Sequence, residues 1–173
     1  FFEGSAHVPL LIMPPQGRSL PHNISVEAPA DLVDIYPTIL AMAGLSSPVS
    51  VSGKNLLEPV PMDRMFFGNS LNKNFCVMEE KVKLVYSAVG DHVLLFDLNT
   101  DPMEQHNLAK DPAWQERKAK LWKLLLEHTA QYTPEALDEN GQFLTYEAPH
   151  FPGDVPGRWF GFHYHDYSVD TFH

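Results

Sequence analysis

The sequence predicts the end of an α/β domain, followed by a small α+β subdomain and an irregular tail. A continuous apolar run at residues 8–13 precedes one amphipathic helix, as in the buried parallel strands and covering helices of α/β proteins. Four short strand patterns and a long amphipathic helix come next, which is typical of a sheet with one packed helix. An aromatic-rich stretch without a clear period ends the chain. We therefore expect three parts: residues 1–60, 61–131 and 132–173.

The first part begins directly before its predicted strand. The run at 8–13 is closed by Pro14 and Pro15 and is preceded only by a short segment that starts at Phe1. Because a domain rarely begins in mid-strand, we expect further chain before residue 1. That missing chain can carry chemistry that residues 1–173 do not show.

The helix after the strand has clear start and stop signals. Asp31 or Asp34 can cap its N-terminus, Pro37 is tolerated near its first turn, and Gly44 supplies the left-handed residue that ends it. An apolar stripe at helical spacing predicts the face that packs. The stripe consists of Leu32, Ile35, Tyr36, Ile39, Leu40 and Ala43.

Four strands are predicted in the second part, at residues 65–67, 75–78, 82–86 and 92–96. Short turn signals separate them, so neighbouring strands should pair as antiparallel hairpins. Asp111 and Pro112 then predict the start of a helix. Its buried face should comprise Trp114, Leu121, Trp122, Leu125 and Leu126, and its solvated face Arg117, Lys118, Lys120 and Lys123.

Composition excludes several classes of protein. The 173 residues carry 12 Lys and Arg against 22 Asp and Glu, a net charge of −10, which argues against a non-specific nucleic-acid binder and against docking on an anionic membrane. No apolar run approaches the roughly 20 residues that a spanning helix needs. The single cysteine, Cys76, excludes an internal disulfide and a cysteine-based zinc cluster. One cysteine suits the cytoplasm and the periplasm equally, so the compartment stays open.

Histidines are the first candidates for chemistry. His163 and His165 could bind a metal from one face of a strand, but no further ligand stands at a recognisable spacing, so packing histidines are the simpler interpretation. His7 precedes the predicted strand, and strand ends are where α/β proteins place their sites. A buried histidine with an ordinary hydrogen-bond partner is the simpler interpretation there too.

Acidic residues and the lone cysteine have structural interpretations as well. Asp97, Asp101 and Glu104 crowd one short segment that lacks the glycine and glutamate positions of a calcium loop. We expect a turn in which Asp and Asn side chains bond the local backbone. Cys76 lies in a predicted strand beside Phe75 and Val77, which favours a small core residue over a nucleophile.

Four segments together resemble the sulfatases of the alkaline phosphatase superfamily. Residues 2–12 are similar to the family's Tyr/Phe-Glu-Gly-x-x-Arg/His-Val-Pro-Leu segment, and residues 31–44 to its Val-Asp-x-Tyr-Pro-Thr-x-Leu helix. Residues 53–57 resemble the Gly-x-Ser-Leu loop that follows. Residues 95–109 resemble Leu-Tyr-Asp-Leu-x-x-Asp-Pro-x-Glu-x-x-Asn-Leu. Residues 110–131 match the family's late helix in type, whereas the tail from residue 132 has no counterpart that we can place.

The resemblance implies the C-terminal part of an enzyme that hydrolyses sulfate esters. Such enzymes use a formylglycine made in a Cys/Ser-x-Pro-x-Arg motif and a divalent metal, usually calcium. Neither that motif nor an Asp-His-Gly or Asp-Asn-Gly metal pair occurs here, and Cys76 is followed by Val77-Met78-Glu79. The family's active-site lysine would lie just before residue 1. The resemblance therefore places the nucleophile and the metal outside this chain, and no catalytic residue within it.

Three residues remain as candidates for substrate binding: His7, Trp159 and His163. His7 aligns with a position that is often Arg in the family. Trp159 and His163 belong to the aromatic-rich tail, which we expect to border the active-site cleft, to join a second subunit in a homo-oligomer, or to fold back on its own subdomain. The expected substrate is the sulfate ester of a small molecule or glycan. The alternatives are a phosphodiester or phosphonate monoester hydrolase of the same superfamily, and a binding or assembly module without chemistry.

Overall fold

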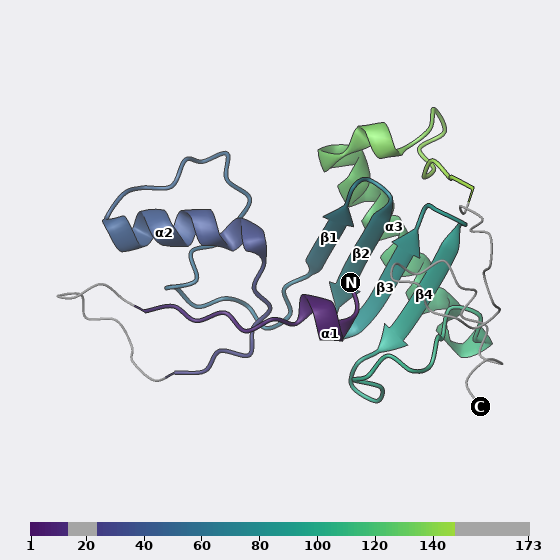
Figure 1. Ribbon diagram of the computed structural model, residues 1–173, viewed down its shortest axis with the longest axis horizontal. Helices are drawn as coiled ribbons and strands as arrows, with labels where there is room; N and C mark the ends of the chain where they lie inside the picture. The colour runs from purple at the N-terminus through teal and green to yellow at the C-terminus, as the bar shows by residue number, and fades with distance from the viewer. Residues whose placement is uncertain (14–23, 148–173) are drawn as a thin grey trace, which may run out of the picture. The chain divides into compact units, whose positions relative to one another are not determined.

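A computed structural model describes residues 1–13 and 24–147 (Figure 1). The chain forms two compact units. One consists of Val8–Phe66, and the other joins Phe1–His7 to the chain from Phe67 onward. The first seven residues thus belong with the second half of the chain, although the sequence suggested a single piece over residues 1–60.

The unit of residues 8–66 is organised around the helix α2, Ile35–Ala43, which follows a 3₁₀ turn at Leu32–Asp34. A capping box starts this segment: the Asp34 backbone N–H bonds back to Asp31, and the Asp34 carboxylate accepts from the Asp31 backbone N–H at 2.8 Å. Gly44 ends the helix with φ of 76°, which glycine adopts without strain. The predicted cap, Pro37 position and stop signal are confirmed.

The predicted strand at 8–13 is wrong: these residues belong to no helix or strand. A strand needs a neighbour to pair with its N–H and C=O groups, and the described part of this unit offers none before β1. Its side chains are instead exposed, and Leu11 is 92% exposed. The apolar stripe of α2 is also largely exposed, at Leu32, Ile35, Tyr36 and Ile39. The buried positions of this helix are Pro37 and Thr38.

The second unit contains a four-stranded sheet in the order β1-β2-β3-β4, with β2–β3 and β3–β4 paired antiparallel. The strands are Phe66–Ser70, Asn74–Glu79, Val82–Ser87 and His92–Asp97. The β2–β3 turn has positive φ at both Glu80 and Lys81, as type I′ hairpins require. The predicted antiparallel α+β subdomain is confirmed.

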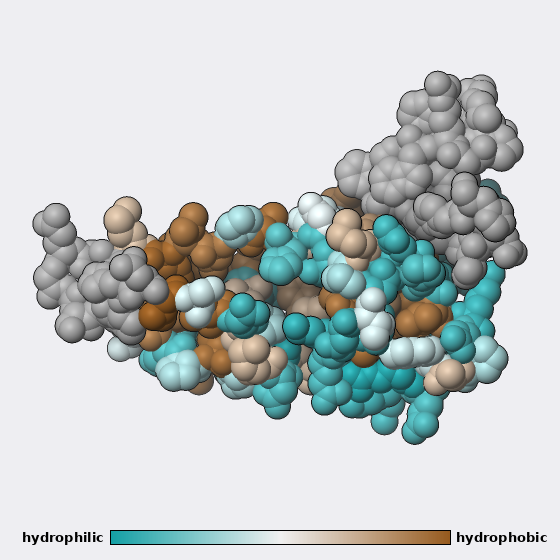
Figure 2. Space-filling view, turned by 90° about the horizontal axis from the view of Figure 1, so that it is seen from below, coloured by the Kyte–Doolittle hydropathy of each residue, from teal (hydrophilic) through white to brown (hydrophobic). Residues whose placement is uncertain are grey.

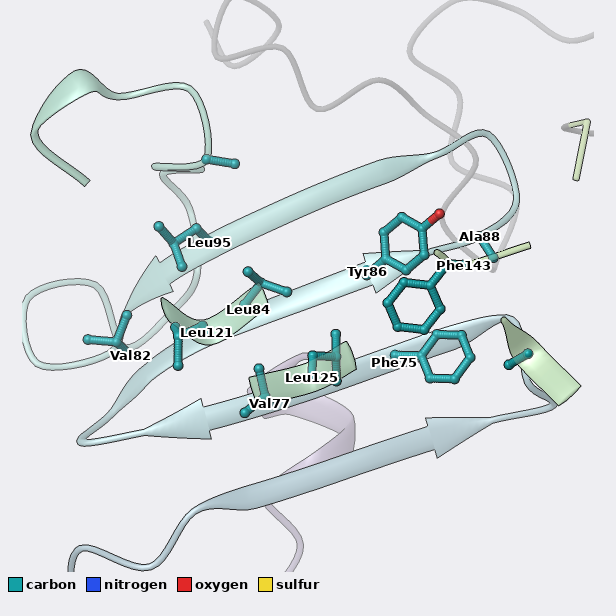
Figure 3. Packing of buried hydrophobic residues seen from close by; sticks show 12 residues of the cluster. Phe75, Val77, Val82, Leu84, Tyr86, Ala88, Leu95, Leu121, Leu125 and Phe143 are labelled. Atoms are coloured by element: carbon teal, nitrogen blue, oxygen red, sulfur yellow. The ribbon is translucent and has the colours of Figure 1, made fainter. Parts of the chain in front are cut away.

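One helix, α3, covers one face of this sheet (Figure 1). It spans Gln115–Tyr132 and follows a 3₁₀ turn at Pro112–Trp114, where the Asp111 carboxylate accepts from the Ala113 N–H. Leu121 and Leu125 are fully buried against the sheet (Figure 3). Trp114, Trp122 and Leu126 pack against the same core. The predicted cap and apolar face are confirmed. The core residues are Phe75, Val77, Val82, Leu84, Tyr86, Ala88, Leu95, Ala109, Leu121, Leu125, Ala136 and Phe143.

The subdomain continues past residue 131 in the structure. Phe143 inserts its ring between Phe75 and Tyr86, with ring centroids 4.6 and 4.7 Å apart (Figure 3). Tyr146 forms an isolated bridge with Val89. The described beginning of the aromatic-rich tail is therefore part of the core of its own subdomain.

Residues 1–7 cover the opposite face of the sheet. Val82, Leu84 and Tyr86 of β3 point into the core under α3, so the alternation of a strand turns Lys83 and Val85 to the other face. Segment 1–7 contains the short helix α1, Glu3–Ala6, which lies on this second face (Figure 1). The Phe2 ring packs 5.9 Å from that of Phe96, the β4 partner of Lys83. Two covered faces explain why β3 is buried from Val82 through Tyr86.

Candidate functional site

A cluster of charged side chains lies between segment 1–7 and the sheet. The Lys83 Nζ atom is 2.5 Å from Glu3 Oε1 and 2.8 Å from Glu104 Oε1, and it donates to the Phe1 carbonyl at 2.9 Å. Glu104 Oε2 in turn accepts from the Glu3 backbone N–H at 2.5 Å. One lysine therefore joins two glutamates that stand 101 residues apart in the sequence. We call Glu3, Lys83 and Glu104 the charge cluster.

The charge cluster is buried. The side chains of Lys83 and Glu104 are 3% and 2% exposed, and that of Glu3 is 25% exposed. Charged side chains are almost never fully buried unless they are paired, and here each charge has an opposite charge in contact. The backbone supplies two further hydrogen bonds, from the Glu3 N–H and to the Phe1 carbonyl. The three side chains form one ionic network, in which Glu104 Oε1 makes an ion pair with Lys83 but no hydrogen bond.

Glu104 reaches the cluster from the turn that follows β4. Asp97 and Asp101 act there as predicted: Asp97 accepts from the Asn99 backbone N–H, and Asp101 from those of Gln105 and His106. The Glu104 side chain instead contacts a distant segment, at Glu3, and the sheet, at Lys83. Its φ of 55° is in the left-handed region, which a glutamate seldom adopts.

His7 lies at the solvent side of the charge cluster. Its Nδ1 atom is 3.0 Å from Glu3 Oε2, and its side chain is 81% exposed. The expectation of a buried histidine is therefore wrong, because the segment that carries it does not enter a sheet. The partner itself is an ordinary one: a carboxylate four residues earlier, one helical turn away.

Trp159 and His163, the other candidates for substrate binding, lie outside the described residues, and so does the pair His163 and His165. Among residues 1–13 and 24–147, no group of three or more His, Cys, Asp or Glu side chains could hold a metal ion. At the charge cluster, the Lys83 ammonium occupies the position between the carboxylates that a cation would need. The described residues therefore do not fit the metal that the resemblance implies.

Cys76 does not fit a nucleophile either. It is fully buried on β2, opposite Val85, and burial raises the pKa of its thiol to about 12. A thiol with that pKa carries almost no thiolate at neutral pH, and the thiolate is the reactive form. The prediction that Cys76 is a core residue is confirmed.

A second buried ion pair organises the unit of residues 8–66. The fully buried Asp34 carboxylate accepts from both terminal nitrogens of Arg64, at 2.6 and 2.9 Å, and from the Lys54 backbone N–H at 2.7 Å. Burial disfavours its ionised form, but the hydrogen bonds from Arg64, Lys54 and Asp31 outweigh this and lower the pKa of Asp34. Thr38 adds a bond to the same loop by accepting from the Leu56 N–H. The contacts fix the 45–62 loop on α2.

Two of the four basic side chains predicted for the solvated face of α3 form contacts within the subdomain. Arg117 donates to the Glu79 carbonyl, and its terminal nitrogens lie 2.9 and 3.1 Å from the Glu79 and Glu80 carboxylates. Lys118 donates to the Ala109 carbonyl. Lys120 and Lys123 do lie on the exposed side of the helix. These contacts fasten α3 to the β2–β3 turn, and they bring no residue to the charge cluster.

Comparison with known proteins identifies the relatives of this chain. A family model described as "N-sulphoglucosamine sulphohydrolase, C-terminal" matches residues 1–131. Arylsulfatase K of Bos taurus is 35% identical over 127 residues, which is 62% of this chain and 23% of that protein. The choline-sulfatase of Rhizobium meliloti is 34% identical over 150 residues, which is 80% of this chain and 28% of that protein.

The chain thus spans about a quarter of the length of the curated relatives that it matches. A solved structure of a 2-O glycosaminoglycan sulfatase is 22% identical, with a TM-score of 0.48, over 61% of this chain and 26% of that one. No helix in the described parts of the chain combines the length and the apolar character that a membrane crossing requires.

Proposed function

Because this chain belongs to the N-sulphoglucosamine sulphohydrolase C-terminal family of sulfatases, we propose that the protein containing it hydrolyses sulfate esters. The match over residues 1–131 is the observation that carries the proposal. It covers the unit of residues 8–66 and the other unit up to residue 131, including all three residues of the charge cluster. The curated relatives named arylsulfatase and choline-sulfatase support the same reaction class.

The proposal assigns the reacting groups to chain outside residues 1–173. In that part, a formylglycine would attack the sulfur atom of the ester. A divalent metal, which we expect to be calcium, would polarise the sulfate oxygens. Cys76, the single cysteine of this chain, is buried and the pKa of its thiol is raised to about 12, so we assign it no part in the reaction. The contribution of this chain is then to position, to cover and to bind.

We further propose that residues 1–60 include the end of the catalytic α/β domain. The unit of residues 8–66 exposes much apolar surface, visible as brown atoms in Figure 2. Leu10, Ile12, Ile39 and Met42 line an open apolar groove in it. Apolar surface of this extent needs a cover in a soluble protein. A neighbouring strand and its sheet would provide that cover and would also pair the backbone of residues 8–13.

The substrate class that we propose is a sulfated small molecule or glycan. The family description names a sulphoglucosamine, a sulfated sugar, and choline sulfate is a small ester. Among the described residues, we propose His7 as a substrate contact, because its side chain is exposed and is held by Glu3.

Trp159 and His163 are proposed to border the same cleft or to join a second subunit. Deleting residues 150–173 should then raise KM or lower the oligomeric mass measured by light scattering.

Parallel assays of the full-length protein test this function. We expect release of sulfate from an aryl sulfate or a sulfated glucosamine to exceed release of phosphonate from an aryl phosphonate by at least about 100-fold in kcat/KM, about 2.7 kcal/mol of transition-state discrimination. The reverse preference would assign the protein to the phosphonate hydrolases of the superfamily. No turnover of either substrate would favour a binding or assembly module.

A further inference from the structure

We propose that the charge cluster is a positioning device: Glu104, acting through Lys83 and Glu3, holds segment 1–7 on the sheet in one orientation. The His7 side chain, at the end of this segment, is thereby held at a fixed place relative to β3. This inference rests on the proposed function, since it gives the cluster a role in the turnover of sulfate esters.

Burying the charge cluster costs free energy of desolvation. Three ionised groups lie together between a sheet and a segment that also offers apolar contacts, such as Phe2 against Phe96. Buried ion pairs seldom stabilise more than apolar side chains of the same volume, because both charges lose their water. Stability alone therefore does not explain why charges occupy this position.

The charge cluster also restricts how segment 1–7 can lie on the sheet. Apolar side chains tolerate small shifts and rotations of one surface on another, whereas a buried ionic network is satisfied in one arrangement only. The Lys83 ammonium donates hydrogen bonds to Glu3 Oε1 and to the Phe1 carbonyl, and it forms an ion pair with Glu104 Oε1 at 2.8 Å. Sliding segment 1–7 by one residue would leave a buried charge unpaired. The network therefore selects a single position of the segment along β3.

The backbone conformation of Glu104 is unusual as well. Its φ of 55° is unfavourable for a residue with a Cβ, and such conformations persist where the surroundings impose them. The same residue places one carboxylate oxygen on Lys83 and the other on the Glu3 backbone N–H. Glu104 thus contacts the side chain of Lys83 on the sheet and the main chain of Glu3 in the docked segment. It is the anchor on the sheet side, and Glu3 is the anchor on the segment side.

Loosening segment 1–7 should affect turnover through the position of His7. This residue ends the segment, is our proposed substrate contact, and lies 3.0 Å from the Glu3 carboxylate. Fixing the segment on the sheet limits the positions open to the His7 side chain. Since a misplacement of about 1 Å can cost about 100-fold in rate, loosening the segment should lower kcat even though no cluster residue touches the reacting atoms.

Three forms of the full-length protein test the inference. Glu104→Gln removes the charge of Glu104 and so weakens its contact with Lys83. Lys120→Met is the control: it removes an exposed lysine from its contact with Glu79. The triple variant Glu3→Leu, Lys83→Met and Glu104→Leu replaces the network with apolar side chains, which should keep the protein folded. We expect Glu104→Gln and the triple variant to lose about 10- to 100-fold in kcat, while Lys120→Met retains the wild-type value.

The triple variant separates positioning from stability. We expect its Tm to equal or exceed that of the wild type while its kcat stays low. A triple variant with wild-type kcat, or a wild-type kcat for Glu104→Gln, would overturn the inference. A triple variant that fails to fold would also contradict it, because that outcome would make the charges a requirement of stability.

Amide hydrogen exchange tests the docking without any activity. The Glu3 N–H, which bonds Glu104, should exchange at least about 10-fold faster in Glu104→Leu, with the amides of α3 unchanged. An unchanged Glu3 amide would overturn the docking role. If the wild type hydrolyses no sulfate ester, the proposed function fails, and the exchange result still decides whether the cluster holds the segment.

Discussion

The ring of Phe1 lies directly over the backbone of Gly68 in β1. A Cβ added at Gly68 would stand 2.5 Å from the Cε1 atom of the Phe1 ring, closer than real atoms approach. The absence of a side chain at residue 68 is therefore what makes room for Phe1. Together with the Lys83 contacts, this packing shows that segment 1–7 is seated across the sheet from β1 to β4.

Gly68→Ala should loosen segment 1–7, because its methyl group would displace the Phe1 ring. We expect faster amide exchange in residues 3–7 of this variant and little change in α3. Gly4→Ala is the matched control, since a Cβ at Gly4 meets no atom within 4 Å. Equal amide exchange of the segment in the two variants would show that the Phe1 ring does not help to hold segment 1–7 on the sheet.

Leu125→Ala should destabilise the subdomain by about 2–5 kcal/mol, as truncation of buried leucines does. Leu125 is 1% exposed in the core under α3. Lys123→Ala, two residues earlier on the exposed side of the helix, should change stability by less than about 0.5 kcal/mol. Urea unfolding followed by tryptophan fluorescence measures both. Equal losses would contradict the assignment of the buried face.

Local patterns predicted the subdomain well because its elements are stabilised within reach of their own sequence. The hairpins pair neighbouring strands, and the Asp111 cap and the apolar spacing around Leu121 define α3. The run at 8–13 was predicted as a strand from the same kind of pattern. A strand also needs a partner, which no property of its own residues supplies.

Asp34 should make the unit of residues 8–66 sensitive to acid. Its native pKa is lowered, so it lies below the unfolded value of about 3.9. The stabilisation is therefore complete above that value and is lost as the pH falls through the native pKa. Exchange of the Lys54 amide, which bonds Asp34, reports the local opening.

Asp34→Asn should weaken this unit by about 3–5 kcal/mol near pH 7, since it breaks a buried ion pair and leaves Arg64 unpaired. The difference from the wild type should shrink towards pH 3. Asp63→Asn, an exposed neighbour of Arg64, is the control and should leave the Lys54 amide unchanged. A pH-independent difference would contradict the assigned ionisation of Asp34.

Cys76 should resist thiol reagents in the native protein. Its burial and the pKa of about 12 predict negligible labelling by iodoacetamide at pH 8, and full labelling after unfolding in urea. Rapid stoichiometric labelling without urea would show that the β2 core is open.

The charge cluster could not be predicted in the same way as the sheet. Lys83 stands in an apolar strand pattern, and that is the one local signal that a partner exists. Glu3 and Glu104 belong to segments that resemble those of sulfatases, but nothing in their spacing indicates that they meet. His7 was predicted to be buried because the segment was expected to enter a sheet; its exposure follows from the docking of Glu3.

The most direct test of the account is the rate of sulfate release, measured side by side for the full-length protein and for residues 1–173 alone, with an aryl sulfate as substrate. We expect turnover by the full-length protein and none above a blank by residues 1–173, because these residues contain no Cys/Ser-x-Pro-x-Arg motif and no Asp-His-Gly or Asp-Asn-Gly pair. Turnover by residues 1–173, or none by the full-length protein, would contradict it.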